Sequence, residues 1–173
     1  IPLDRAFVDA AAKNAAEHNM LIIVDEVQTG NGRTGTLYAY EQYGLHPDIV
    51  TTAMGLAGGL PIGATMFAER LADILPPGSH GSTFGGNPVS CAAAVNVISR
   101  IDSALMAHIT EKSKYLVSEL KSIKGITGVS GMGYMLGASV TGDAHEIAAK
   151  CLENGLLILT AKENLRMLLP LNI

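Results

Sequence analysis

The sequence predicts an α/β fold: part of a large domain with a mostly parallel sheet, followed by a small C-terminal α+β domain. Three observations support this fold class. Short β-branched apolar runs alternate with helical patterns over the first hundred residues, as in βαβ units. A long helical stretch then begins at Pro88. Beyond Gly125 the pattern changes to short strands around a single helix.

The first half of the chain is expected to hold two helices and three strands. Apolar side chains at helical spacing predict an amphipathic helix from Asp4, its N-cap, to about His18. The continuous apolar run Met20 to Val24 suits a central parallel strand. A short helix and two further strands are expected at residues 37–43, 48–52 and 62–68.

In the second half, Pro88 suits the first position of a helix, which we expect to continue to about Lys124 with a bend near Asp102. One glycine-rich strand, one helix and two strands follow at residues 132–140, 144–154, 156–159 and 165–168. The expected organisation is a C-terminal part of a large domain at 1–100, a linking helix at 101–124 and a partial small domain at 125–173.

Composition narrows the class of function. Twelve basic and sixteen acidic residues give a net charge of −4, which does not favour a nucleic-acid or anionic-membrane partner. No apolar run approaches the roughly 18 residues of a membrane span, no signal peptide opens the chain, and Cys91 and Cys151 lie far apart without metal-ligand neighbours. We therefore expect a cytoplasmic protein with no metal site. The lack of an initiator Met suggests the middle and end of a longer protein.

Asp25 is the first candidate site residue, in the string Asp25-Glu26-Val27-Gln28-Thr29 after the apolar run. The carboxyl end of a parallel strand is where open α/β sheets bind ligands. A carboxylate there favours the protonated form of a ring nitrogen, and Gln28 is expected near the phenolic oxygen of the same ring. This combination points to pyridoxal 5′-phosphate (PLP). The alternative is an acid that caps the next turn.

The glycine-rich string Gly30 to Gly35 fits the dinucleotide pattern G-x-G-x-x-G. In that fingerprint the first glycine follows the strand directly and the third enters a helix. Here five mostly polar residues intervene, so a turn with Arg33 as an anchor is favoured and a nucleotide site is the alternative.

Two further strings carry candidate binding residues. The loop from His80 to Pro88 combines small residues, the hydroxyls of Ser82 and Thr83 and a following helix, which predicts a phosphate cradle; an ordinary loop is the alternative. Arg166 lies inside an apolar strand pattern, where a guanidinium needs a partner. That partner is a substrate carboxylate or a structural acid.

Together these strings resemble the class III PLP-dependent aminotransferases, in particular the acetylornithine/succinylornithine branch. The matching text is LIIVDEVQTGNGRTGTLYAYEQYGLHPDIVTTAMGLAGGLPIGA, then GSHGSTFGGNP, then NLRMLLPLNI. It extends over nearly the whole chain in the family's order. The resemblance implies the PLP-dependent transferase type I fold and a homodimer whose active site is shared between subunits.

The resemblance also implies residue roles. Asp25 to Gln28 (Asp25, Glu26, Val27, Gln28) and Thr83 would bind the cofactor, with Thr83 and Ser82 reaching the phosphate in the neighbouring subunit. Ser82 and Arg166 would bind substrate, Arg166 through the α-carboxylate.

The chain departs from the family at the catalytic position, where Met54 stands in place of the lysine that bonds to the cofactor and moves the proton. A thioether is neither an amine nucleophile nor a base. Leu169 also replaces the first proline of a usual Pro-Pro pair. The family's chains are more than twice as long, and the absent front half carries a phosphate loop, a stacking aromatic and another arginine. Without the strands of that half, we expect an apolar edge of the sheet to be exposed here.

The predicted function is amino transfer from N-acetylornithine, or a related ω-amino donor, to 2-oxoglutarate through PLP, inactive as written because of Met54. A non-catalytic remnant or binding fragment of the same fold is one alternative. A nucleotide-binding domain that uses the Gly30 to Gly35 loop is another.

Overall fold

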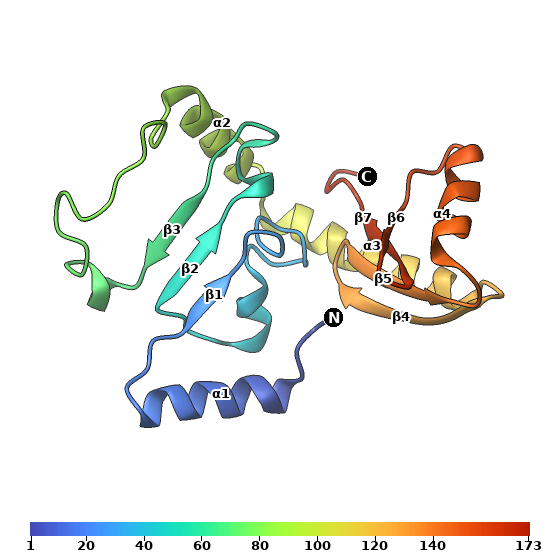
Figure 1. The fold of residues 1–173 in the computed structure, drawn as a ribbon, viewed down its shortest axis with the longest axis horizontal. Helices are drawn as coiled ribbons and strands as arrows, with labels where there is room; N and C mark the ends of the chain where they lie inside the picture. The colour runs from blue at the N-terminus through green and yellow to red at the C-terminus, as the bar shows by residue number, and fades with distance from the viewer. The chain divides into compact units, whose positions relative to one another are not determined.

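The computed structural model describes residues 1–173, and the chain divides into two compact units (Figure 1). The first unit contains Leu3–Gly32 and Thr36–Asp102. The second contains Ile1–Pro2, Arg33–Gly35 and Ser103–Ile173. The domain boundaries expected from the sequence, at 100 and 124, remain a prediction.

The first unit is built on a three-stranded sheet in the order β1-β2-β3. Strands β1 and β2 are parallel, with Asp25 opposite Thr51, whereas β2 and β3 are antiparallel, with Thr52 opposite Ala64. The elements of this unit are α1 (Arg5–Glu17), β1 (Ile23–Asp25), η1 (Ala39–Tyr43), β2 (Ile49–Thr52), η2 (Met54–Ala57), β3 (Ala64–Phe67), η3 (Glu69–Leu71) and α2 (Pro88–Ile98).

Strand β1 differs from the expected central strand. It is shorter than the apolar run, it lies at the edge of the sheet, and the Ile23 residue is 63% exposed. The third strand also turns back antiparallel instead of extending a parallel sheet. An apolar run shows that a strand is suited to burial. Whether the strand lies in the middle of the sheet depends on how many other strands pair with it.

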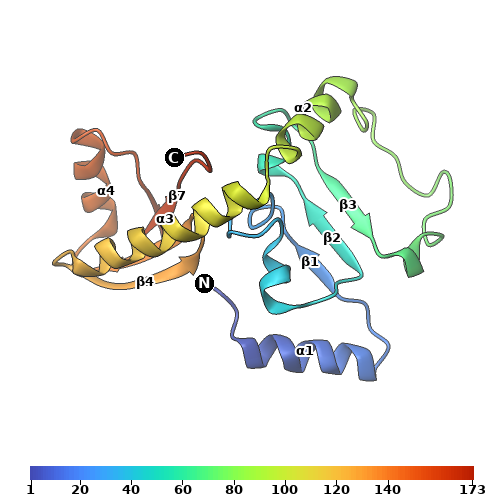
Figure 2. The ribbon, with the colours of Figure 1, turned by 180° about the vertical axis from the view of Figure 1, so that it is seen from behind.

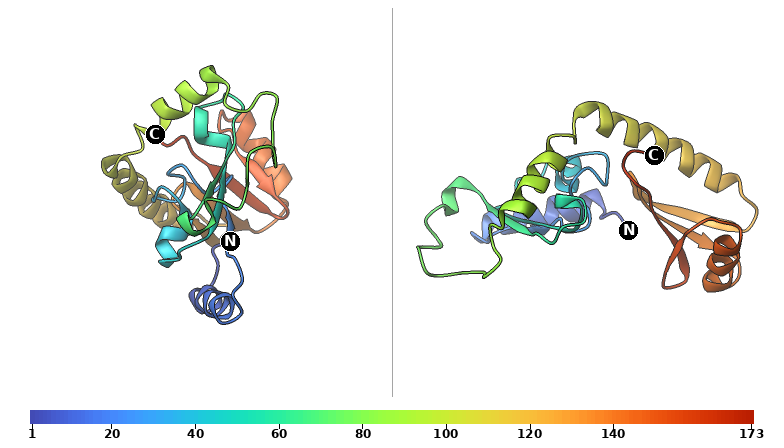
Figure 3. Two further views of the ribbon diagram at one scale, coloured as in Figure 1. Left: turned by 90° about the vertical axis from the view of Figure 1, so that its left-hand side faces the viewer. Right: turned by 90° about the horizontal axis from the view of Figure 1, so that it is seen from above.

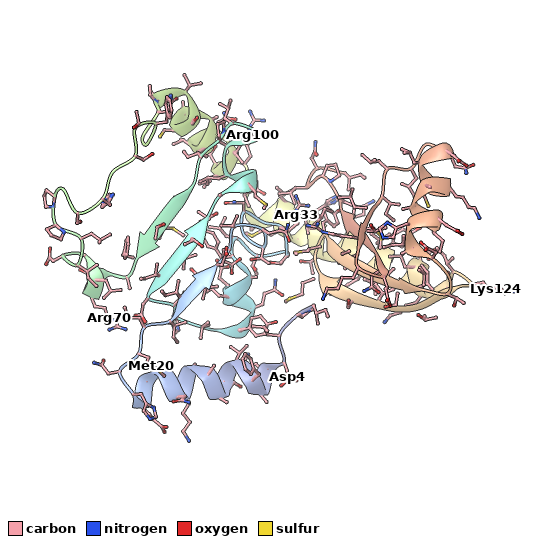
Figure 4. All side chains as sticks on the ribbon, in the orientation of Figure 1. Asp4, Met20, Arg33, Arg70, Arg100 and Lys124 are labelled. Carbon is pink, nitrogen blue, oxygen red and sulfur yellow. The ribbon has the colours of Figure 1, made fainter.

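Two helix starts expected from the sequence are confirmed. The Asp4 carboxylate accepts hydrogen bonds from the backbone N–H groups of Ala6 and Phe7 at 2.9 and 3.3 Å, at the beginning of α1 (Figure 4). Pro88 occupies the first turn of α2 behind an Asn87 cap. The buried apolar cluster of this unit joins η2 to α2 through Leu56, Ala57 and Ala94.

The second unit is a four-stranded antiparallel sheet in the order β4-β5-β7-β6, with α3 beside β4 and α4 beside β6 and β7 (Figures 2 and 3). Its core cluster contains Ala138, Ala144 and Leu165. The elements are α3 (Ser103–Ser122), β4 (Ile126–Met132), β5 (Met135–Val140), α4 (Ala144–Glu153), β6 (Leu159–Ala161) and β7 (Asn164–Leu168).

The sequence predicted too few breaks in this half of the chain. The helix expected after Pro88, with a bend near Asp102, is two helices, α2 and α3, which are broken and bent at residues 99–102, where the bend was expected. The single strand expected from Met132 is the turn and second arm of the β4–β5 hairpin, and β4 was not predicted. No single helix has the length and apolarity to cross a membrane; α2 and α3 meet that test only as a broken pair, by length and composition alone.

The β4–β5 hairpin turn packs closely on the short segment Arg33–Gly35. The Tyr134 N–H donates to the Arg33 carbonyl oxygen at 2.9 Å, and the Ser113 hydroxyl donates to the Gly133 carbonyl oxygen at 2.7 Å. The Arg33 guanidinium donates through Nη1 to the Leu169 carbonyl oxygen, and burial lowers the pKa of Arg33 (Figure 4). The expected anchoring role of Arg33 therefore has a defined acceptor.

Candidate active site

The candidate site is the edge of the first unit's sheet where the parallel strands β1 and β2 end. Asp25 is the last residue of β1, and Thr52 is the last residue of β2. Carboxyl ends of parallel strands meet at one edge of a sheet, so Asp25 and the segment Ala53–Met54 share that edge. The placement of Asp25 at a strand end, expected from the sequence, is confirmed.

The Asp25 carboxylate is held in a defined orientation. Its Oδ1 accepts hydrogen bonds from the Val27 N–H at 2.9 Å and from the Thr51 hydroxyl at 3.3 Å. Its Oδ2 accepts no hydrogen bond from the protein, and the residue is exposed. The carboxylate therefore caps the next turn, which was the alternative to ligand binding considered from the sequence. Its second oxygen is still available to a ligand.

Glu26 is the buried residue that fixes this turn, with an exposed fraction of 1%. Its Oε2 accepts from the Thr29 hydroxyl at 2.5 Å, and its Oε1 accepts from the Tyr40 N–H at 2.9 Å. Its backbone carbonyl also accepts from the Gly30 N–H. Both carboxylate oxygens are thus engaged within the protein, which supports a structural role; the cofactor contact expected for Glu26 remains a prediction.

Val27 and Gln28 lie in the turn and are both half-buried. The Gln28 side-chain amide forms no hydrogen bond with the protein, so its donor and acceptor are free for a ligand. The roles expected for these two residues remain predictions.

Met54 has an unusual backbone. It begins η2 with φ 39°, in the left-handed region that side-chain-bearing residues rarely adopt, and it is 61% exposed. Such conformations cost on the order of 1–3 kcal/mol and concentrate at functional sites. The position at which the resemblance implies a catalytic lysine therefore has a strained backbone, and that equivalence remains a prediction.

Asn31 is a site residue that the sequence analysis missed. It is 4% exposed, and its Nδ2 donates to the Thr52 hydroxyl oxygen and to the Ala53 carbonyl oxygen, both at 3.1 Å. Its φ of 57° is left-handed. The available signal was an Asn between two glycines, since Asn tolerates this conformation better than most residues.

Ser82 and Thr83 lie in the exposed loop between η3 and α2. The Ser82 carbonyl oxygen accepts from the Gly85 N–H at 3.1 Å, so the backbone closes a turn, while neither hydroxyl is bonded within the chain. Their predicted phosphate and substrate contacts remain predictions.

Arg166 belongs to the second unit. It lies in β7, opposite Gly137 of β5 and Leu159 of β6, and it is half-buried. No acidic side chain forms an ion pair with its guanidinium. The structural salt bridge considered as an alternative is therefore absent, and the substrate contact expected for Arg166 remains a prediction.

Two backbone N–H groups of the glycine loop donate hydrogen bonds to carbonyl oxygens of the protein and are not free for a ligand. The Gly30 N–H donates to the Glu26 carbonyl oxygen at 3.0 Å, and the Gly32 N–H donates to the Leu37 carbonyl oxygen at 3.2 Å. A dinucleotide site needs bare amides in front of a helix, and the next helical turn here begins only at Ala39. The geometry gives the nucleotide alternative no support.

Comparisons with known proteins identify the family. The sequence profile of class-III aminotransferases matches residues 1–173. The chain is 47% identical to acetylornithine aminotransferase of Haemophilus ducreyi, over 99% of this chain and 44% of that protein. It is 41% identical to the enzyme of the same name from Clostridium acetobutylicum, over 100% of this chain and 46% of that protein. The chain belongs to the class-III aminotransferase family and spans less than half the length of these relatives.

Solved structures confirm the predicted fold class. The N-acetylornithine aminotransferase of Stenotrophomonas maltophilia K279a superposes with a TM-score of 0.87 at 33% identity, over 99% of this chain and 47% of that chain. The ornithine delta-aminotransferase of Plasmodium falciparum superposes with a TM-score of 0.90 at 30% identity, over 100% and 47%.

Class-III aminotransferases use PLP, and the residues present fit this group only in part. The free Oδ2 of Asp25 suits a protonated ring nitrogen, and the unbonded amide of Gln28 suits a ring oxygen. Met54 does not suit the covalent bond, since its sulfur carries no transferable proton and cannot form an imine. The side chains of Asp25 and Gln28 therefore suit the cofactor ring, while Met54 does not suit its covalent attachment, and these roles remain predictions.

Proposed function

We propose that this chain is a portion of a PLP-dependent aminotransferase of the acetylornithine type, acting on N-acetylornithine or a related ω-amino donor with 2-oxoglutarate as acceptor. When bound, the cofactor serves as an electron sink for carbanion chemistry. The chain's own residues would bind and orient: Asp25 keeps the ring nitrogen protonated, Gln28 faces a ring oxygen, and Arg166 pairs with a substrate carboxylate.

The observation that carries this proposal is the Asp25 carboxylate. Two hydrogen bonds to Oδ1 fix its plane at the end of β1, and Oδ2 remains open. A capping acid also engages only one oxygen, so the support comes from the place of the open Oδ2, at the carboxyl ends of parallel strands. A preorganised carboxylate with one free oxygen suits a protonated ring nitrogen, and the unbonded amide of Gln28 follows three residues later in the chain.

Titration of the chain with PLP tests this assignment. We expect Asp25→Asn to weaken PLP binding at least tenfold, because an amide stabilises the protonated pyridine less than a carboxylate does. Asp73→Asn is the matched control, since Asp73 is an exposed acid of the same unit. Equal losses in both variants, or no loss in either, would contradict the role of Asp25.

The same proposal states that the chain does not turn over, because position 54 provides neither nucleophile nor base. We expect no PLP to be fixed to the protein by borohydride, and we expect Met54→Lys to gain one cofactor mass on reduction. Intact mass spectrometry measures both. Residue 54 of the parent chain carries no amine, so a borohydride-fixed adduct at one particular lysine, formed at one equivalent of PLP and located by peptide mapping, would show that the assignment of the site is wrong.

A homodimer with a shared site is part of the proposal. The exposed hydroxyls of Ser82 and Thr83, next to a Phe84 that is 84% exposed, support a loop that reaches the cofactor phosphate of a second copy. Light scattering should give twice the mass of one chain if these residues meet a partner. The proposed location is the cytoplasm, in keeping with the two free cysteines.

The second candidate is a non-catalytic remnant that keeps the fold, which Met54 favours directly. A longer chain that carries Met54→Lys separates the two: recovered amino transfer supports a lesion in an enzyme, and no recovery supports the remnant. A thermal shift with NAD but none with PLP would instead favour nucleotide binding.

A further inference from the structure

Asn31 connects the glycine loop to the backbone at position 54. Its Nδ2 spans the Thr52 hydroxyl oxygen and the Ala53 carbonyl oxygen, each at 3.1 Å, at the point where β2 gives way to η2. The residue is almost fully buried, so water does not compete for these contacts. A buried amide that bridges two groups restrains both of them.

The orientation of this amide follows from the chemistry of its partners. A carbonyl oxygen only accepts hydrogen bonds, so the group facing Ala53 must be the NH₂ of Asn31 and not its oxygen. The Oδ1 of Asn31 is left buried without a hydrogen-bond partner. An unpartnered buried acceptor is costly, so the two contacts through Nδ2 are kept in spite of that cost.

The Ala53 carbonyl is also the first acceptor of η2, receiving the Leu56 N–H at 2.9 Å. Ala53 itself has φ −163° and ψ −132°, and Met54 follows with φ 39°. The side-chain amide of Asn31 therefore holds the peptide group between Ala53 and Met54, which directly precedes the left-handed residue Met54. Without it, one helical-turn hydrogen bond would restrain this peptide.

We propose that Asn31 is a positioning residue that fixes the backbone of residue 54 in its left-handed conformation, and so fixes where the side chain of residue 54 starts. The inference rests on the proposed function, in which position 54 corresponds to the cofactor-bonding position of the family. Asn31 acts through residue 54 and contacts neither cofactor nor substrate in this assignment.

Amide hydrogen exchange of the chain as it stands tests the positioning directly. Asn31→Gly removes both side-chain contacts while keeping a residue that tolerates positive φ. We expect exchange at the Leu56 N–H, read in peptides covering residues 53–58, to become on the order of tenfold faster. Asn19→Gly is the matched control, because Asn19 has φ 52° and is exposed; it should leave these peptides unchanged.

Variants at Thr52 keep the test decisive if Asn31→Gly fails to fold. Thr52→Val removes one of the two acceptors of Asn31 and should speed the same exchange by a smaller factor, about threefold. Thr52→Ser retains the hydroxyl and should restore the slow rate. Unchanged exchange in Asn31→Gly, or in Thr52→Val where only that variant folds, would overturn the proposal.

Adding Met54→Lys links the positioning to the cofactor. We expect the lysine variant to form a borohydride-fixed PLP adduct, and we expect Asn31→Gly in the same background to slow adduct formation about tenfold, measured as mass gain with time. No adduct with Asn31 intact would count against the proposed function, while the exchange experiment still decides the role of Asn31. Equal adduct rates with and without Asn31, or faster exchange confined to Asn19→Gly, would count against the positioning role.

Discussion

At the scale of single residues, the buried polar side chains place the strictest demands on their surroundings. Glu26 meets them with a hydroxyl and a backbone N–H, while the hydroxyl of Tyr134 is buried in the second unit without a hydrogen-bond partner. Burial also raises the pKa of Tyr134, because the phenolate would be desolvated. An unpaired buried hydroxyl has a free-energy cost that its removal should recover.

We therefore expect Tyr134→Phe to raise the free energy of unfolding by about 1 kcal/mol, since it deletes the unpaired hydroxyl and keeps the ring. Urea denaturation measures the change. Tyr115→Phe serves as control, because Tyr115 is exposed and its hydroxyl is already hydrated; it should shift stability by less than about 0.5 kcal/mol. A loss of stability in Tyr134→Phe would reveal a partner for this hydroxyl.

Asp48 gives a prediction about pH. Its carboxylate accepts the Ile22 N–H at 2.8 Å and pairs with the Arg70 guanidinium, with Nε at 2.7 Å; the first contact contributes most to lowering the pKa of Asp48. A folded-state pKa below the unfolded value of 3.8 stabilises the fold above that value. This stabilisation is lost as pH falls through the folded-state pKa.

Asp48→Asn should therefore lower stability near pH 7, and the gap between parent and variant should narrow as the pH falls below about 4. Urea denaturation across this range measures the gap. Asp73→Asn should follow the parent chain at every pH, since Asp73 is exposed. A gap that stays constant with pH would mean that Asp48 acts through its shape and not through its charge.

Single residues also show how far the sequence could predict the site. Asp25 could be placed, because an acid directly after an apolar strand falls at the ligand-binding edge of an α/β sheet. The left-handed backbone of Met54 and the hydrogen bonds of Asn31 could not be predicted, because both depend on loop geometry. The hydrophobic periodicity of a sequence does not report loop geometry.

At the scale of elements, the sequence predicted helices better than hairpins. The Asp4 cap of α1 and Pro88 in the first turn of α2 have local signatures, and both helices begin where expected. Strand β4 carries two internal glycines and a serine, which weaken the strand pattern, and its turn was read as part of the following strand. Only the pairing of β4 with β5 makes the segment a strand.

Gly133 in that hairpin turn allows a test. A Cβ at this position would lie 2.5 Å from the Arg33 carbonyl oxygen and from the Thr34 carbonyl carbon, and its φ is 54°. We expect Gly133→Ala to destabilise the fold by about 2–4 kcal/mol, from the left-handed backbone and from the backbone clash together.

Gly44→Ala is the matched control for this change. Gly44 has φ 60° and no atom within 4 Å of an added Cβ, so the variant reports the backbone term alone, about 1 kcal/mol. Thermal or urea denaturation compares the two. An equal loss of unfolding free energy in both variants would show that the hairpin can move away from Arg33 without a free-energy cost.

At the scale of the whole molecule, the chain consists of two units, each with its own buried apolar cluster. Each unit with its own core is a candidate for opening as a separate cooperative unit. We expect Gly133→Ala to speed amide exchange across β4, β5 and β7 while peptides from β1, β2 and η2 keep the parent's rates. Uniform acceleration along the chain would show a single cooperative unit.

The fold class was predictable at this scale because the motifs extend over the whole chain in the family's order, and the profile match covers residues 1–173. An exposed apolar edge of the sheet was also predicted, but its assignment to β1 was not, because a strand's place in a sheet depends on which other strands pair with it. The exposed Ile23 is the local result of that pairing.

The contact between Arg33 and Leu169 explains why one departure from the family pattern is tolerable. The guanidinium is received by the main-chain oxygen of residue 169, an atom that every amino acid supplies. Exchanging a cyclic for an open side chain at this point therefore leaves the acceptor in place and removes only the ring's restriction on torsional freedom. The side chain of residue 169 is therefore not needed for this contact, whereas the donor at position 33 must be long enough to reach the Leu169 carbonyl oxygen.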